Sequence, residues 1–143
     1  MKNEPFVIER TYKAPINTVW EAITDKDKMK EWYFSLKEFK PEVGFEFTFT
    51  GGTEENQYLH LCRITEVIPG KKLSHTWKYD GYTGESLVTF ELFAHGEETT
   101  LRLTHAGLET FPPIKDFDKT NFEQGWTYII GKSLLEYLEV KQD

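Results

Sequence analysis

The sequence has 143 residues, which suits one domain over residues 1–143, and its 24 acidic and 17 basic side chains give a formal net charge of -7. An acidic surface repels phosphate groups, so we expect neither nucleic acid nor an anionic membrane as a partner. Cys62 is the single cysteine and forms no internal disulfide. The sequence shows neither a signal peptide nor a stretch suited to membrane insertion, so we expect a cytoplasmic protein.

The first quarter of the chain predicts one strand followed by two short helices. Residues 6–12 alternate apolar and polar side chains, which is typical of a strand, although Arg10 falls on the apolar face. A helix follows, with Pro15 at its first position and an apolar stripe at helical spacing. The stripe consists of Ile16, Val19, Trp20 and Ile23. A second helix is expected to begin near Asp25 and to carry Trp32 into the core.

Between residues 36 and 105 the apolar period changes to two. Residues 45–49 and 73–79, for example, alternate large apolar side chains with polar ones. Turn signals such as Pro69-Gly70 and Asp80-Gly81 separate these runs. Consecutive short strands joined by tight turns are typical of an antiparallel meander.

The last third of the chain predicts a loop over residues 107–119 and then one long helix. Residues 120–123 have the spacing of a capping box, which would begin the helix. At ~1.5 Å per residue, a helix that runs to about Glu139 is about 28 Å long and crosses a whole sheet. Gly125 and Gly131 within it predict a close approach of the helix to the sheet. The expected inner stripe is Phe122, Trp126, Ile129, Ser133, Leu134, Tyr137 and Leu138.

Strands that are grouped together, rather than alternating with helices, indicate an α+β fold with an antiparallel sheet. A long amphipathic helix must then cover the apolar face of the sheet, which twists and wraps around it. We therefore expect a curved antiparallel sheet of about six or seven strands around the C-terminal helix, with two short helices after the first strand.

Several short motifs, spread over nearly the whole chain, resemble one protein family. They are Glu9–Pro15 with Val19-Trp20, Lys30–Trp32, Glu66–Leu73 with Thr76-Trp77, Leu103–Gly107, Gly125-Trp126 and Leu135–Leu138. Together they are similar to the SRPBCC superfamily of START-like and birch-allergen-like proteins. Within it, they resemble the family named after the C-terminal domain of the activator of heat-shock protein 90 ATPase. The resemblance implies a helix-grip fold, but the scaffold serves carriers, sensors and enzymes alike.

Three hypotheses about function follow. The first is non-catalytic binding of a small hydrophobic or amphipathic ligand, lipid-like, sterol-like or polyketide-like, in a cavity between the sheet and the C-terminal helix. The alternative is a protein-interaction module with a chaperone of the heat-shock protein 90 type as partner, although eukaryotic activators also carry an N-terminal domain that is not part of this sequence. A second alternative is a cyclase-like or hydrolase-like enzyme that uses an inner-face histidine.

The walls of such a cavity are expected to be aromatic, since aromatic residues make up 15% of the chain. The candidate ligand-binding residues are Trp32, Phe45, Phe47, His60, Trp77, Tyr79, Phe90, His105, Phe122, Trp126 and Ile129. A void of roughly 300 Å³ would cost about 7 kcal/mol, comparable with the ~5–15 kcal/mol stability of a domain. Either the rings close the space, or water or ligand occupies it. Phe111 and Phe117, in the loop before the long helix, are the candidate gate, or simply pack over the end of the helix.

The inner face is also expected to carry polar groups. Arg10 is interpreted as an edge side chain that reaches water rather than as a ligand anchor. His60, His75 and His105 lack the spacing of a metal site, so we expect hydrogen-bonded structural histidines, no metal and no cofactor. The sequence has no catalytic motif, so we expect no enzymatic activity, and His60 and His75 are the only candidates for acid–base chemistry.

Overall fold

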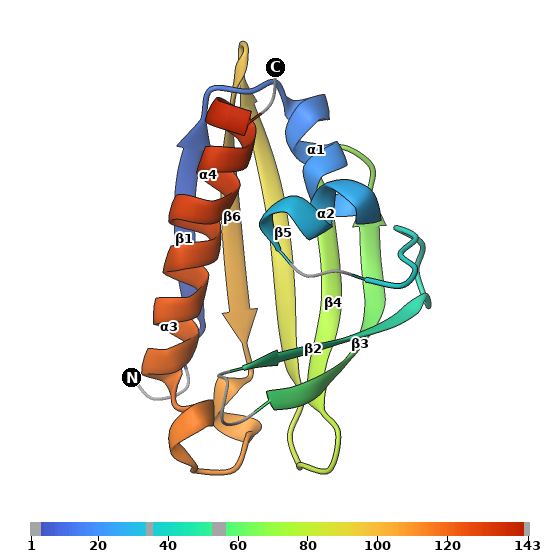
Figure 1. Cartoon of the computed structure of the whole chain (residues 1–143), viewed down its shortest axis with the longest axis vertical. Coiled ribbons are helices and arrows are strands. Elements are labelled where there is room, and N and C mark those ends of the chain that lie inside the picture. The colour runs from blue at the N-terminus through green and yellow to red at the C-terminus, as the bar shows by residue number, and fades with distance from the viewer. Residues whose placement is uncertain (1–3, 34–35, 53–56, 142–143) are drawn as a thin grey trace.

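The computed structural model describes residues 4–33, 36–52 and 57–141, and it has the predicted α+β architecture (Figure 1). The elements are β1 (Phe6–Tyr12), α1 (Ile16–Thr24), α2 (Lys26–Trp32), β2 (Glu46–Gly52), β3 (Gln57–Ile68), β4 (Lys72–Tyr79), β5 (Ser86–His95), β6 (Glu98–Ala106), α3 (Lys119–Tyr128) and α4 (Leu134–Glu136). Two short 3-10 turns, Leu108–Thr110 and Lys115–Phe117, precede α3. The π-helical turns Ile129–Ser133 and Tyr137–Lys141 flank α4, so the C-terminal helix runs without a break over residues 119–141.

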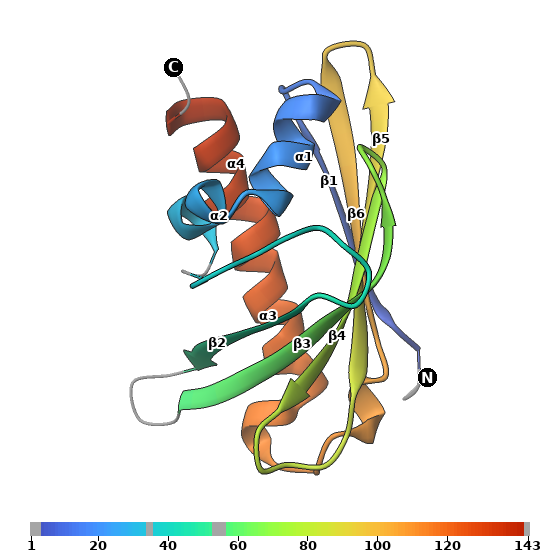
Figure 2. The ribbon, with the colours of Figure 1, turned by 90° about the vertical axis from the view of Figure 1, so that its right-hand side faces the viewer.

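The strands of the described chain form one antiparallel sheet in the order β1-β6-β5-β4-β3-β2. Consecutive strands from β2 to β6 are neighbours, whereas β1 pairs with β6, with Phe6 opposite His105. The register between β3 and β4 shifts between Ile64 and Glu66, as in a β-bulge. A bulge bends its strand, and Figure 2 shows the β2–β3 hairpin curling out of the plane of the other strands toward α3.

Two short helices follow β1 as predicted, and extended residues set their ends. Pro15 is the extended N-cap of α1, with φ -68° and ψ 158°, and not the first helical residue that the sequence suggested. The proline ring fixes φ but leaves ψ free, so both positions are open to it. Asp25 ends α1, and its carboxylate accepts hydrogen bonds from the backbone N–H groups of Asp27 and Lys28, which caps α2.

The C-terminal helix begins earlier than predicted and is wound differently. Asp118 is its extended N-cap and no side chain caps this end, so Thr120 lies inside the first turn and the predicted capping box does not form. A π-helical hydrogen bond joins the N–H of Leu134 to the carbonyl of Ile129. A π turn holds more residues than an α turn, so residues four apart fall on the same face of this helix. Ile130, four residues after Trp126, is therefore fully buried, whereas Ile129 is half-buried.

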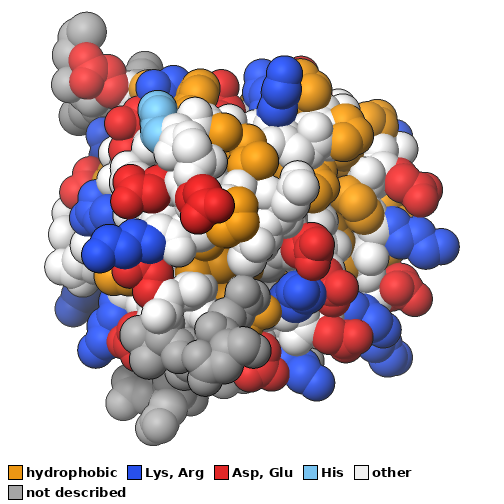
Figure 3. Space-filling model, turned by 90° about the horizontal axis from the view of Figure 1, so that it is seen from above, with side chains coloured by type: hydrophobic (Ala, Val, Ile, Leu, Met, Phe, Trp, Pro, Cys, Tyr) orange, Lys and Arg blue, Asp and Glu red, His pale blue; other side chains and the backbone are white. Residues whose placement is uncertain are grey.

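All the helices lie on one face of the sheet, so the core is the layer between them (Figures 1 and 2). The end of the molecule that carries the C-terminus shows acidic and basic side chains around scattered apolar ones (Figure 3). None of the helices in the described ranges is long and apolar enough to cross a membrane.

The two glycines of the C-terminal helix differ in their surroundings. A Cβ on Gly125 would meet no atom within 4 Å, so the predicted close approach is wrong at this position. A Cβ on Gly131 would lie 3.4 Å from Nε of Arg10, so here the helix does approach β1. Arg10 is itself exposed and donates a hydrogen bond to the carbonyl of Glu9, which agrees with its interpretation as an edge side chain.

Candidate functional site

A continuous cluster of aromatic rings occupies the space between the sheet and the C-terminal helix. Its centre is Trp77 on β4, whose ring centroid lies 4.8 Å from that of His60, 5.2 Å from His105 and 5.7 Å from Trp126. Phe49 lies at 5.6 Å. Rings from β2, β3, β6 and α3 therefore meet around one indole.

Most of the predicted wall residues take part in this cluster. The buried ones are Trp32, Phe47, His60, Trp77, Tyr79, Phe90, His105, Phe122 and Trp126. Phe45 and Ile129 are half-buried and pack at the margin of the core. The period-two pattern also points to Phe49, which shares the face of Phe47 and which the predicted wall omits.

The rings fill most of the space that they enclose. A cavity on the side of α2 measures about 10 Å³, which is room for about one water molecule. Its lining is Ile23, Met29, Trp32, Tyr33, Phe39, Phe47, Leu73, His75 and Phe90. Of the two alternatives that the sequence leaves open, closure by aromatic rings describes this structure.

Tyr33 is the ring that closes this space from the helical side. Its centroid lies 5.1 Å from Trp32, 6.1 Å from Trp126 and 5.9 Å from Phe49, so it connects α2, the C-terminal helix and the sheet. Burial, with a smaller contribution from Cys62, raises the pKa of Tyr33 well above its ordinary value. Tyr33 follows the last residue of α2, and periodicity assigns no face to a residue outside a regular element. The sequence prediction therefore misses it.

A directed chain of hydrogen bonds crosses the core from the helix to the sheet. The indole N–H of Trp126 donates to Nδ1 of His105 over 3.0 Å, and Nε2 of His105 lies 2.7 Å from Oγ of Ser86. Oγ of Ser86 in turn donates to the carbonyl of Trp77 over 3.3 Å. Since Nδ1 of His105 accepts, its proton must sit on Nε2. Burial, and secondarily His75, lowers the pKa of His105 to about 3, which keeps the ring neutral.

This arrangement does not suit Ser86 as a nucleophile. A serine 2.7 Å from a histidine is the pair that many hydrolases use. In those enzymes the histidine accepts the serine proton, whereas Nε2 of His105 already carries a proton and donates it to Ser86. The indole of Trp126 stabilises this tautomer, so the pair acts as a structural link between strands and helix.

His60 and His75 are also buried and neutral. Nδ1 of His60 donates to the carbonyl of Tyr58 over 3.0 Å, and Nδ1 of His75 donates to that of Thr76 over 2.9 Å. Burial lowers the pKa of both rings to about 4, against an ordinary value of 6.5. Within the described ranges, no group of three or more His, Cys, Asp or Glu side chains is placed to hold a metal ion.

Trp77 carries a buried donor that the described residues do not satisfy. Its side chain is 6% exposed, and its Nε1 makes no hydrogen bond within the part of the chain that the structure describes. Burial raises the pKa of Tyr79 and the neighbouring indole of Trp77 partly offsets this, yet the two groups do not reach hydrogen-bond geometry. Buried polar groups are nearly always paired in folded proteins.

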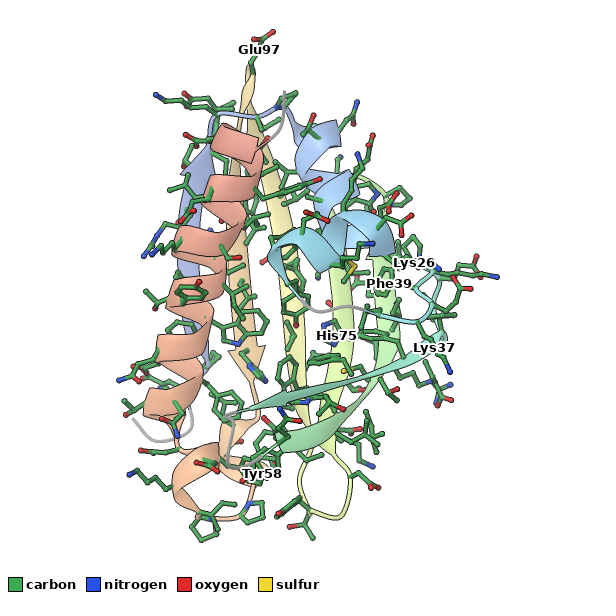
Figure 4. The ribbon with its side chains drawn as sticks, in the orientation of Figure 1. Lys26, Lys37, Phe39, Tyr58, His75 and Glu97 are labelled. Carbon is green, nitrogen blue, oxygen red and sulfur yellow. The ribbon has the colours of Figure 1, made fainter. Side chains whose placement is uncertain are left out.

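The loop between β6 and α3, which is the predicted gate, is folded against one end of the cluster. Phe117 stacks on Tyr79 with a centroid distance of 4.3 Å, and Phe111 stacks on a phenylalanine of α3 at 5.9 Å. The hydroxyl of Tyr58, which Figure 4 shows at this end, donates a 2.6 Å hydrogen bond to Asp116, and this bond raises the pKa of Tyr58 to about 12. Both phenylalanines are buried, so the loop is closed.

A larger outer groove, of about 740 Å³, is lined by residues of β2, β3 and β4 together with Val43, Gly44 and Glu85. Its lining includes Glu46, Arg63, Lys78 and Glu85, together with several threonines. The groove is open to solvent and carries both signs of charge. The volume of the groove suits a small ligand, but small-molecule sites usually bury about 70–90% of the surface of the ligand. Because the groove is open to solvent, the enclosed aromatic space is the better candidate site.

The sequence matches, over residues 13–139, the family model described as Activator of Hsp90 ATPase homolog 1-like protein. The chain belongs to this family. Among solved structures, this AHSA1-like chain is similar to DynU16, a protein in the dynemicin biosynthetic locus, with 23% identity and a TM-score of 0.80. That match covers 97% of this chain and 48% of DynU16, so this chain spans about half the length of DynU16.

Two further solved structures show the same AHSA1-like architecture. The MLL2253 protein from Mesorhizobium loti is 29% identical, with a TM-score of 0.75 over 98% of this chain and 99% of that one. CalU16 from Micromonospora echinospora is 24% identical, with a TM-score of 0.70 over 96% of this chain and 77% of that one. No curated protein matches the chain. At these identities, the similarities to DynU16 and CalU16 establish the fold and leave the ligand open.

Proposed function

We propose that this AHSA1-like domain binds one small, uncharged hydrophobic molecule between the sheet and the C-terminal helix, and that it binds the molecule without transforming it. The observation that carries the proposal is the make-up of the enclosed space. Aromatic rings wall it, and its buried polar side chains are histidine, serine and threonine, with no ionised side chain among the described residues. Small-molecule sites are mostly apolar with a few oriented polar groups.

Binding is coupled to the displacement of Tyr33. The cavity of about 10 Å³ next to this ring admits no organic ligand, so a ligand must take the place of a side chain. Tyr33 is the candidate, because it lies outside a regular element and contacts α2, the sheet and the C-terminal helix at once. The closed form then competes with the ligand. The apparent affinity is the affinity of the open form multiplied by the fraction of molecules that are open.

Binding without catalysis is supported by the protonation states of the core. Each of the three buried histidines has a neutral ring whose Nδ1 or Nε2 proton is already committed to a hydrogen bond. A general base needs a pKa near the working pH, and burial moves all three well below it. The chaperone partner remains a hypothesis that rests on the family name, because no contact in the described chain favours it.

The proposal is tested by comparing ligand affinity with stability in the variant Tyr33→Ala. Truncation removes a half-buried ring and is expected to lower the free energy of unfolding by about 2 kcal/mol. It also removes the competitor, so the affinity for a neutral two-ring aromatic such as 2-naphthol is expected to rise. Affinity is measured by tryptophan fluorescence and calorimetry, with a sterol and a fatty acid as further members of the panel, and stability by urea denaturation.

Phe90→Ala is the matched control, because Phe90 lines the same cavity but belongs to β5. Phe90 forms part of the wall and does not compete with the ligand. Its truncation is therefore expected to lower both the free energy of unfolding and the affinity for the ligand. An unchanged or weaker affinity in Tyr33→Ala would overturn the role of Tyr33. Failure of every member of the panel to bind to either form would overturn the proposed function itself.

A further inference from the structure

We propose that residues 112–118 form a lid over one end of the aromatic space, that the hydrogen bond from Tyr58 to Asp116 latches this lid, and that the ligand enters and leaves beneath it. The inference rests on the proposed function for the identity of the site and adds the route by which the ligand reaches it. The opening of the lid is a property of the chain alone, so it is measured without ligand as well as with it.

Phe117 is the plug of the lid. Its ring is 4% exposed, stacks on Tyr79 at a centroid distance of 4.3 Å, and meets Tyr58 at 5.0 Å and Tyr82 at 5.1 Å. Tyr58 lies near the start of β3, Tyr79 at the end of β4 and Tyr82 in the turn that follows β4. These tyrosines form a box at one end of the sheet, and nothing passes this end until Phe117 leaves the box.

A row of ring contacts leads from the plug to the space that Tyr33 fills. Behind Phe117, the ring of Tyr79 lies 4.8 Å from that of His60, and His60 stacks on Phe49 at 4.4 Å. Phe49 in turn contacts Tyr33 at 5.9 Å. The lid therefore closes one end of the same cluster, and an apolar molecule that enters beneath it meets aromatic rings along its whole route.

The latch is the 2.6 Å hydrogen bond that the hydroxyl of Tyr58 donates to the carboxylate of Asp116 at this end of the molecule (Figure 4). Among the residues that the structure describes, it is the one hydrogen bond that joins residues 112–118 to the sheet. The bond raises the pKa of Tyr58 to about 12, so the hydroxyl keeps its proton at neutral pH. A hydrogen bond to an ionised group is among the stronger ones, so this single contact favours the closed lid.

The segment that precedes the lid is fixed to the sheet. Oγ1 of Thr110 accepts a 2.9 Å hydrogen bond from the N–H of Glu85, beside the start of β5. Gly84, with φ +102°, passes so close to the loop that a Cβ there would overlap the carbonyl of Thr110. Within residues 112–118, by contrast, the backbone hydrogen bonds are local to the segment. The lid therefore pivots between Thr110 and Asp118, where α3 begins.

Limited digestion with chymotrypsin measures the opening of the lid without ligand. Cleavage after Phe117 requires this ring to leave the box, so its rate reports the open fraction when closing is faster than cleavage. Tyr58→Phe removes the latch but keeps the ring, and it is expected to raise this rate by about fivefold to tenfold, the effect of one hydrogen bond. Cleavage after Phe90, which is 3% exposed on β5, requires global unfolding and is the reference in the same digest.

Further variants assign the effect to the latch. Tyr82→Phe is the matched control, because it removes a hydroxyl from the same box and leaves the bond between Tyr58 and Asp116 in place, so the rate is expected to stay unchanged. Asp116→Ala is expected to act like Tyr58→Phe, and the double variant is expected to add nothing more, because both changes break one bond. Asp116→Asn keeps an oxygen that accepts from Tyr58, so a smaller rise is expected.

Stopped-flow fluorescence with 2-naphthol measures the passage of a ligand. The lid closes over the filled site as well as the free one, so Tyr58→Phe is expected to raise the association and dissociation rate constants by the same factor, about fivefold to tenfold, and to leave Kd unchanged. Tyr33→Ala is expected to change Kd instead, because Tyr33 competes for the space itself.

The outcomes separate this inference from the proposed function. If Tyr58→Phe leaves cleavage after Phe117 unchanged, or raises cleavage after Phe90 by the same factor, the latch is overturned. If cleavage after Phe117 rises while both rate constants for 2-naphthol stay unchanged, the ligand takes another route, and the inference is overturned while the binding function stands. If no member of the ligand panel binds, the proposed function is overturned and the route of entry with it.

Discussion

At the scale of single residues, the core is organised by the directions of its hydrogen bonds. Trp126, His105 and Ser86 each donate to the next group, and the series ends on the carbonyl of Trp77. This series of hydrogen bonds requires His105 to carry its proton on Nε2. It links the C-terminal helix to β6 and β5 and thereby holds the sheet and the helix at a defined separation.

Ser86→Ala is expected to lower the free energy of unfolding by about 1–3 kcal/mol, because it leaves the Nε2 proton of His105 buried without an acceptor. Ser74→Ala is the control. Ser74 donates to Thr89, a half-buried residue that can turn to water, so a smaller loss is expected. Urea denaturation of both variants checks the prediction, and equal losses would argue against a special role for the series.

At the scale of elements, the C-terminal helix combines α-helical and π-helical turns to fit its inner stripe to the sheet. The hydroxyl of Tyr12 on β1 donates a 2.6 Å hydrogen bond to the carbonyl of Ile130, inside the first π turn. The backbone of the helix is thus anchored to the edge strand at the point where Ile130 is buried. Gly125 lies one turn earlier, on the exposed side.

Gly125→Ala is expected to raise the free energy of unfolding by about 1 kcal/mol, because alanine favours the helix and the new Cβ meets no atom within 4 Å. Gly131→Ala is expected to gain less, since its Cβ would lie 3.4 Å from Nε of Arg10 and the residue sits in a π turn. Thermal denaturation of both variants is the measurement. A loss of stability in Gly125→Ala would mean that the helix packs more closely there than the structure shows.

The strands and helices were predictable from the sequence because the spacing of apolar side chains and the turn-forming residues determine local structure. The strand over Phe6–Tyr12 and the strands between Glu46 and Ala106 follow the alternation of apolar side chains. The capping box at Thr120 was wrong, and Ile129, a predicted wall residue, lies at the margin of the core. Both depend on where the helix starts and how it winds, and neighbouring elements settle these features rather than the local pattern.

The candidate site was predictable only in part, for the same reason. The inward alternation of Trp77, His60 and His105 places them on one face, but their hydrogen-bond partners depend on the register of separate strands. Tyr33 has no periodic signal, because it follows the end of a helix. Its role depends on three elements meeting in space, which no sequence pattern records.

At the scale of the whole molecule, three buried neutral histidines connect stability to pH. Burial lowers the pKa of His60 and His75 to about 4 and that of His105 to about 3, from an ordinary value of 6.5. The unfolded chain therefore takes up protons at a higher pH than the folded chain. Their contribution to stability is complete above about pH 6.5 and is lost as the pH falls toward about 4.

The free energy of unfolding is expected to fall in this window by about 1.4 kcal/mol per pH unit for each histidine. Urea denaturation at several pH values measures the slope. In His75→Phe the slope between about pH 6 and 5 is expected to drop by about a third, because one of the three groups is removed. A slope that His75→Phe leaves unchanged would mean that this ring is already charged or solvated in the folded protein.

The central claim is that a ligand enters the aromatic space between the sheet and the C-terminal helix by displacing Tyr33. Nuclear Overhauser contacts in the complex with 2-naphthol test it most directly. We expect contacts from the ligand to the rings of Trp126 and Phe90, together with loss of the Tyr33–Trp126 contact that the free protein shows at a centroid distance of 6.1 Å. Ligand contacts only to the outer groove beside Leu61 and Thr76, with the Tyr33–Trp126 contact intact, would contradict the claim.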